Sequence, residues 1–248
     1  VMVSPRAASM GGSQAFLDAG ESYKLGELLK SVIVASANDS AVALAEYLSG
    51  AEESFVRRMN ERAQELGLEN TNYVNCTGLP AQGHYTTARD VAKLSAHLDE
   101  HPLYYQYSTI WMDEILHRGG RVTGLTNTNR LIRFYPDCDG YKTGSTNEAK
   151  YCISATAKKD GMRLIAVVLG TPAGQTRFDE ARAMLEYGFA GYQMFGAIGE
   201  GEALNMSVPV RLGGRDSVSV VSGGASQMLI RKGGQGDISL EVALVERV

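Results

Sequence analysis

Residues 151–169, YCISATAKKDGMRLIAVVL, decide the fold class of this 248-residue chain. Two apolar runs, 151–157 and 162–169, flank the segment Lys158-Lys159-Asp160-Gly161. Asp-Gly between two runs of this kind is a strong signal for a tight β-hairpin. The stretch therefore predicts two antiparallel strands.

Helical patterns lie on both sides of this hairpin. Apolar side chains recur at helical spacing after it, from about 177 to 189, and in four segments before it. The earlier predicted helices cover 25–35, 41–48, 52–66 and a segment that begins at the Thr86-Thr87 cap and ends between His97 and Glu100. Helices around an antiparallel hairpin predict a mixed, layered α/β domain, which we place at residues 1–196.

A change of composition follows at residues 196–201, GAIGEG. Beyond it, short alternating runs are separated by glycine pairs, which is typical of an all-β segment. The runs cover 206–210, 217–221, 227–230 and 238–245. We expect a small all-β domain at 203–248. Because about 45 residues is near the lower limit for an independent core, we expect it to pack on the first domain or to continue past Val248.

Composition narrows the classes of function. The chain has 24 basic and 28 acidic side chains, a net charge of −4 and 44% apolar residues, so it is a globular protein for which nucleic acid is not an expected partner. No apolar window is long enough for a membrane span, and the first residues lack the pattern of a signal peptide. The start at Val1 is unlike that of a translated chain and indicates a fragment or a processed protein.

The three cysteines indicate neither a disulfide framework nor a structural metal site. Cys76, Cys138 and Cys152 are odd in number and have no zinc-ligand spacing. The sequence still permits one disulfide bond between two of these cysteines, with the third as a free thiol.

Two short polar elements interrupt apolar surroundings. Ser36-Ala37-Asn38 lies between two predicted helices, and Lys142-Thr143-Gly144-Ser145 precedes the first strand of the hairpin. Either element alone is a common cap or a chance triplet. Together, a hydroxyl, a carboxamide, an ammonium and a glycine-flanked backbone can transfer protons and hold an acyl or anionic group.

S-x-N followed by K-T-G matches two of the three motifs of penicillin-recognising serine enzymes. Further agreement includes the Leu-Gly-Leu-Glu-Asn-Thr segment at 66–71, Asn-Thr-Asn at 127–129 and Asp-Gly-Tyr before Lys142. Over about residues 1–195 the chain resembles the low-molecular-mass D-alanyl-D-alanine carboxypeptidases, which are penicillin-binding proteins. The resemblance implies their fold, an antiparallel sheet with helices, and suggests that the all-β segment is the start of the family's second domain.

The resemblance also implies roles for individual residues. Ser36 would relay protons between the nucleophile, a lysine and the leaving amine, and Asn38 would hydrogen-bond the substrate peptide and the neighbouring lysine. Lys142 would place positive charge beside Ser36 and the substrate carboxylate. The resemblance also implies four substrate-binding residues. Thr143 would contribute its hydroxyl, and Gly144 would leave room for the peptide. Ser145 would contribute an N–H that binds the oxyanion, and Arg177 would place a positive charge near the terminal carboxylate.

The implied reaction is serine-type removal of the terminal D-alanine from peptidoglycan stem peptides through an acyl-enzyme, in cell-wall biogenesis and cell shape. It requires no cofactor and no metal. The implied location is extracytoplasmic, at the outer face of the bacterial cytoplasmic membrane, with β-lactam antibiotics as covalent inhibitors. The family's C-terminal amphipathic anchor does not occur before Val248, so a membrane attachment would lie outside this chain.

One departure from the family pattern affects activity. The family's nucleophile is the serine of an S-x-x-K motif upstream of S-x-N, and no Ser-x-x-Lys occurs in this chain. We expect that motif before Val1, on a truncated, cleaved or separate segment. The 248 residues alone are not expected to form an acyl-enzyme.

Three other classes of protein fit parts of the sequence: a β-lactamase, a zinc protease and a binding protein without catalytic activity. A class A β-lactamase needs a deacylating glutamate, and the one candidate, Glu69, lies in a segment that the carboxypeptidases share. His97-Leu98-Asp99-Glu100-His101 reads as an inverted zinc-protease motif, but His101 precedes Pro102 at a helix end, where a ligand is poorly placed. A catalytically inactive relative that binds only stem peptides or partners is the non-enzyme alternative, and the missing S-x-x-K is its argument.

Overall fold

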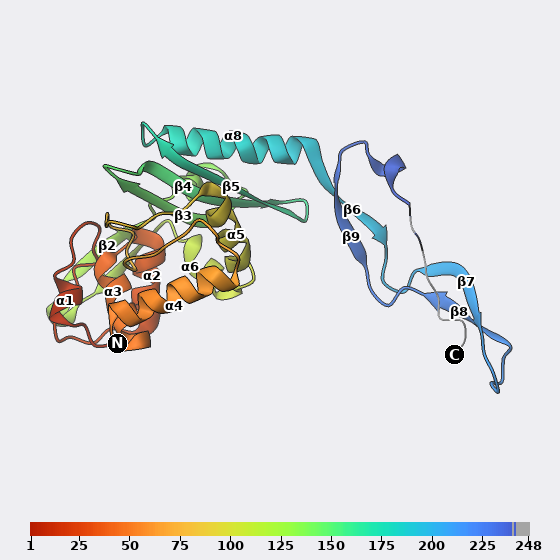
Figure 1. Ribbon diagram of the computed structural model, residues 1–248, viewed down its shortest axis with the longest axis horizontal. Coiled ribbons are helices and arrows are strands. Elements are labelled where there is room, and N and C mark those ends of the chain that lie inside the picture. Colours follow the sequence, from red (N-terminus) through yellow and green to blue (C-terminus); the bar gives the residue numbers. More distant parts are fainter. Residues whose placement is uncertain (240, 242–248) are drawn as a thin grey trace. The chain divides into compact units, whose positions relative to one another are not determined.

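The computed structural model describes residues 1–239 and 241 (Figure 1). The chain forms two compact units. One comprises Val1–Lys158 and Arg163–Glu186, and the other comprises Lys159–Met162 and Tyr187–Val248. Among the described residues, no helix has both the length and the apolar composition needed to cross a bilayer. All three cysteines carry free thiols, so the disulfide that the sequence left open is not formed.

The first unit holds the predicted helices close to the predicted bounds. Thr87 begins one of them as expected, since its Oγ1 accepts a hydrogen bond from the Asp90 N–H at 3.2 Å. The α-helices are α1 (Pro5–Ala8), α2 (Leu25–Ala35), α3 (Asn38–Ser49), α4 (Glu52–Glu65), α5 (Ala88–Leu98), α6 (Tyr105–Ser108), α7 (Leu131–Phe134) and α8 (Thr176–Gly191). Short 3-10 turns cover Pro102–Tyr104 and Arg118–Gly120.

The predicted hairpin is confirmed as β4 (Lys150–Lys159) and β5 (Met162–Thr171), which are neighbours in a sheet of order β3-β4-β5. Asp160 and Gly161 have φ angles of 49° and 77°, the left-handed values that a tight hairpin turn needs. The third strand, β3 (Cys138–Thr146), pairs antiparallel with β4 and carries the K-T-G motif. In Figure 1, α8 lies along one side of this sheet and α2 to α5 lie on the other.

A second hairpin, which the sequence did not predict, completes this unit. Strands β1 (Met112–Leu116) and β2 (Val122–Thr126) pair antiparallel. Their buried residues, Ile115 and Leu125, join the core that forms around α2 and α3. That core also contains Val3, Ala7, Ala15, Leu17, Tyr23, Leu28, Val34, Ala37, Val42 and Ala43. The junction of α2 with α3, which contains Ser36, is therefore fixed by packing on both of its sides.

In its described residues, the second unit is all-β apart from the end of α8 and a 3-10 turn at Gln235–Asp237. Three of the four predicted runs form strands: β7 (Ala203–Pro209), β8 (Ser217–Val221) and β9 (Ser226–Arg231). The fourth, 238–245, falls for the most part outside the described residues. Strand β6 (Tyr192–Ile198), which spans the domain end expected at 196, pairs with β9, and β7 pairs with β8. The structural unit therefore begins at Tyr187.

Candidate active site

The turn between α2 and α3 presents the first motif. Ser36 ends α2 in the left-handed conformation, with φ 60° and ψ 36°, and α3 begins at Asn38. Next to them, the buried Asp39 carboxylate accepts hydrogen bonds from the N–H groups of Ala15 and Leu17 at 3.0 and 3.1 Å. A buried carboxylate that accepts several backbone hydrogen bonds holds its surroundings firmly. The turn is therefore tied to residues 15–17.

The segment from Gly11 to Ser13 runs across Asn38. The Asn38 backbone N–H donates to the Ser13 carbonyl at 2.8 Å, and its Nδ2 donates to the Gly11 carbonyl, also at 2.8 Å. Gly12, at φ +80°, has no room for a side chain, because a Cβ would lie 2.7 Å from Asn38 Nδ2. The sequence indicated only a loop at these glycines, since nothing in the local pattern shows which side chain the loop crosses. Among the described residues, the Asn38 carboxamide oxygen accepts no hydrogen bond.

Lys142 on β3 connects the two motifs. Its ammonium Nζ donates to Ser36 Oγ at 2.7 Å and to the Thr143 carbonyl at 2.9 Å. Burial, together with the positive charge of Arg177, lowers the pKa of Lys142 from 10.5 to about 8. At neutral pH the group is still mainly protonated, but it gives up its proton far more readily than a lysine in water.

The other residues of the K-T-G motif follow Lys142 along β3. The buried Thr143 side chain donates from Oγ1 to Thr128 Oγ1 at 2.7 Å. Gly144 and Ser145 are exposed, and a Cβ at Gly144 would meet nothing within 4 Å. Space is thus open beside the strand at this position. Thr128 belongs to the quoted Asn-Thr-Asn segment, yet the sequence assigned it no role because its partner is distant along the chain.

Arg177, in the first turn of α8, reaches the same sheet. Its Nη1 donates to the carbonyls of Gly144 at 3.0 Å and Cys152 at 3.3 Å. The guanidinium also lies over the rings of Phe178 and Tyr151, with its carbon 4.7 and 5.5 Å from their centroids. Burial lowers the pKa of Arg177. Its Nε is buried without a hydrogen-bond partner in the described part of the chain.

The structure links five of the seven sequence-predicted residues by hydrogen bonds, and among the described residues none of these bonds reaches Asn38 or Ser145. Hydrogen bonds join Ser36, Lys142 and Thr143, and Arg177 reaches the carbonyl of Gly144. The arrangement contains a hydroxyl, a lysine with a lowered pKa, an open strand position and a half-buried cation. Such a set can transfer a proton and hold an anionic group.

Neither enzyme alternative gains support from the structure. Glu69 is exposed, and the N–H of the next residue, Asn70, is held by Asp90 of α5 at 2.8 Å. His97 uses both ring nitrogens, with Arg62 Nη2 at 2.6 Å from Nε2 and the Glu100 carboxylate 3.2 Å from Nδ1. Within residues 1–239 and 241, no group of three or more His, Cys, Asp or Glu side chains is placed to hold a metal ion.

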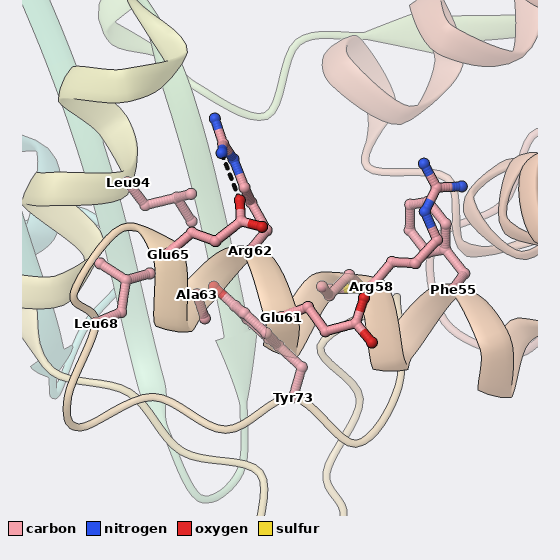
Figure 2. Close-up of a pocket in the computed structure, with 10 residues that line it drawn as sticks. Phe55, Arg58, Glu61, Arg62, Ala63, Glu65, Leu68, Tyr73 and Leu94 are labelled. Carbon is pink, nitrogen blue, oxygen red and sulfur yellow. Dashed lines mark hydrogen bonds and ion pairs between the residues drawn. The ribbon is translucent and has the colours of Figure 1, made fainter.

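A separate hollow of about 470 Å³ lies along α4, away from these residues (Figure 2). Its apolar lining includes Phe55, Leu68 and Leu94, and its rim carries an ion pair in which Arg62 Nη1 lies 2.6 Å from Glu65 Oε2. It contains no residue of either motif.

Comparison with known proteins shows which proteins the whole chain resembles. The chain is 39% identical to D-alanyl-D-alanine carboxypeptidase DacF of Bacillus subtilis over all of its own length and 64% of the relative. It is 35% identical to DacC of Escherichia coli over 96% of the chain and 59% of that relative. The chain therefore spans about three fifths of the curated relatives it matches.

Solved structures show the same fold. Penicillin binding protein 5 from Haemophilus influenzae is 32% identical, with a TM-score of 0.79 over 95% of this chain and 69% of that structure. Penicillin binding protein 6B from Escherichia coli, 28% identical, matches with a TM-score of 0.79 over 96% of this chain and 70% of its own. The fold is thus that of penicillin-binding peptidases. Residues 1–173 match the model of the S11 peptidase family, D-alanyl-D-alanine carboxypeptidase, and the chain belongs to that family.

Proposed function

We propose that the protein of which this chain forms part is a serine-type D-alanyl-D-alanine carboxypeptidase, and that this chain supplies the substrate groove and the proton-transfer residues. The observation that carries the proposal is the 2.7 Å hydrogen bond from Lys142 Nζ to Ser36 Oγ, which joins the two motifs. Family membership supports the reaction class.

The geometry supports a direction for the substrate. The terminal carboxylate would lie near Thr143 Oγ1 and Arg177, where a hydroxyl and a cation are already close to β3. The peptide would then pass the open position at Gly144 without meeting a side chain. The N–H of Ser145 would donate to the oxyanion that forms at the reacting carbonyl. The free carboxamide oxygen of Asn38 would accept from the substrate peptide.

Proton transfer would follow the Lys142–Ser36 pair. A serine hydroxyl attacks the carbonyl carbon of the penultimate D-alanine, a C–O bond forms, and the C–N bond to the terminal D-alanine breaks. The leaving nitrogen takes its proton from Ser36 Oγ, which receives one from Lys142 Nζ, and the proton that the attacking serine releases restores the charged form of Lys142. Water then attacks the acyl-enzyme and releases the shortened peptide. The chain contains no Ser-x-x-Lys, so we assign the nucleophile to protein sequence beyond these 248 residues.

The same proposal covers partners and location. The substrate is the peptidoglycan stem peptide that ends in D-Ala-D-Ala, and β-lactams acylate the same serine. The enzyme would be secreted to the outer face of the cytoplasmic membrane and would contribute to cell-wall remodelling and cell shape.

Intact-mass spectrometry with benzylpenicillin tests the proposal. We expect the full-length gene product to gain the mass of one penicillin and to release D-alanine from diacetyl-L-lysyl-D-alanyl-D-alanine. The 248-residue chain alone should gain none. A full-length protein with neither an adduct nor D-alanine release would overturn the enzyme assignment in favour of a protein that only binds stem peptides.

A further inference from the structure

A second arginine lies beside Arg177. Both Arg130 and Arg177 line a pocket of about 220 Å³ between the end of the 127–129 segment and the start of α8. Thr128, whose hydroxyl accepts from Thr143, lines the same pocket, together with Gly174, Gln175 and Phe178. Thr128 therefore connects the wall of the pocket to the K-T-G motif by a hydrogen bond.

The charges of this pocket are not balanced within it. In the described part of the chain, no carboxylate forms an ion pair with Lys142, Arg130 or Arg177. Burial and, to a smaller extent, the positive charge of Arg130 lower the pKa of Arg177, and both guanidinium groups line the same pocket. Like charges held close together without a counter-ion attract an anionic ligand.

The side chain of Arg130 is held only weakly. It is exposed, and its Nη1 donates to Gln175 Oε1 at a long 3.3 Å. Gln175 in turn donates from Nε2 to Asp179 Oδ1 at 2.9 Å, so the nearby carboxylate bonds to Gln175. A substrate carboxylate would offer Arg130 a negatively charged acceptor, and so a shorter and stronger hydrogen bond, in place of the neutral amide oxygen of Gln175.

We propose that this pocket binds the carboxylate α to the scissile amide nitrogen, with Arg130 as a second cationic substrate-binding residue beside Arg177. The inference rests on the proposed function and deepens it: Arg130 selects peptides whose leaving residue carries a free carboxylate. Amide-terminated peptides would lose this contact.

The test compares N-acetyl-D-alanyl-D-alanine with its C-terminal amide. Dissociation constants come from NMR titration of the full-length protein, and kcat/KM is measured for the corresponding diacetyl-lysyl substrates. In Arg130→Ala, affinity and kcat/KM for the acid fall about tenfold, roughly 1.4 kcal/mol, while the values for the amide change less than twofold. Arg130→Lys should keep part of the preference for the acid over the amide. Arg133→Ala, which removes a neighbouring charge that stacks on Trp111 outside the pocket, keeps all of it.

Gln175→Glu provides a second, nearly isosteric test. A carboxylate at this position would pair with Arg130 and repel the substrate, so binding of the acid should weaken about tenfold and binding of the amide should not. Equal losses for acid and amide, or an unchanged preference in both variants, would overturn the role of Arg130. The titration distinguishes this failure from failure of the proposed function, which would appear as absent turnover and absent penicillin adduct in the wild type.

Discussion

Lys142 Nζ on β3 donates a 2.7 Å hydrogen bond to Ser36 Oγ at the end of α2, across 106 residues of sequence. Because burial and Arg177 lower the pKa of this lysine to about 8, its charge changes within the range where a cell-wall enzyme can be assayed. The pair therefore makes the proposed reaction sensitive to pH.

The first prediction is a descending limb in the pH profile. As the pH rises through about 8, Lys142 loses the proton that it donates toward Ser36, so kcat/KM for a D-Ala-D-Ala substrate should fall nearly tenfold per unit above that point. Steady-state kinetics between pH 6 and 10.5 measure it. Lys150→Met, which removes an exposed lysine at the start of β4, should leave the limb in place. A rate that stays constant up to pH 10 would contradict the role of Lys142.

The second prediction concerns stability. A pKa that falls from 10.5 to about 8 on folding means that the charged form of Lys142 is disfavoured in the native state, by on the order of 3 kcal/mol. Lys142→Met should therefore abolish activity and yet raise the melting temperature at pH 7, with a net gain on the order of 1–2 kcal/mol after two hydrogen bonds are lost.

The stability difference between Lys142→Met and the wild type should depend on pH, because Lys142 binds protons differently in the folded and unfolded chains. Between about pH 8 and 10.5 the unfolded chain binds more protons at this position than the folded chain, so wild-type stability rises with pH in that window. The gain in stability of Lys142→Met over the wild type should therefore shrink as the pH rises. Calorimetry at pH 7 and at pH 10.5 tests this, and an advantage that grows with pH would refute the burial argument.

The third prediction uses two adjacent glycines. Gly12→Ala places a Cβ 2.7 Å from Asn38 Nδ2 in a backbone conformation, φ +80°, that alanine rarely adopts. We expect a stability loss of about 1–2 kcal/mol and at least tenfold slower acylation by benzylpenicillin, because Asn38 must move. Gly11→Ala is the matched control, since its Cβ would meet nothing within 4 Å. Similar acylation rates for the two variants would argue against a positioning role for this loop.

The fourth prediction separates fold from function at Gly144. A Cβ there would contact nothing, so Gly144→Ala should change the melting temperature little. The methyl group would occupy the space proposed for the substrate peptide, and KM should rise at least tenfold while the structure stays intact. An unchanged KM would mean that the peptide does not pass this position.

Sequence patterns predicted the helices and the β4–β5 hairpin because their periodicity is regular and their ends carry ordinary signals such as Thr87 and Asp160-Gly161. They did not predict β1 and β2, because each strand has a single buried residue, Ile115 or Leu125, and so lacks an alternating pattern. Strand β3 was missed as well, since its positions carry glycine and functional polar residues in place of strand-forming ones.

The site was predictable only where a motif marks it. Ser36, Asn38 and residues 142–145 were found through resemblance, and the structure brings Lys142 and Ser36 into contact. The contribution of Gly12 and the pairing of Thr143 with Thr128 depend on tertiary packing between distant segments, which local sequence does not encode.

Two neighbouring residues at the start of α3, Asn38 and Asp39, hold one loop at several points. Asn38 binds the backbone at Gly11 and Ser13, and the buried carboxylate of Asp39 binds it at Ala15 and Leu17. Opening this loop would break four hydrogen bonds together and would leave the buried Asp39 carboxylate, among the described residues, with the N–H of Ser40 as its one remaining donor, which is costly. The loop is thus held at a fixed distance from α3 and is not built to open as a lid, so a peptide that binds at Asn38 would have to fit the space that the loop leaves.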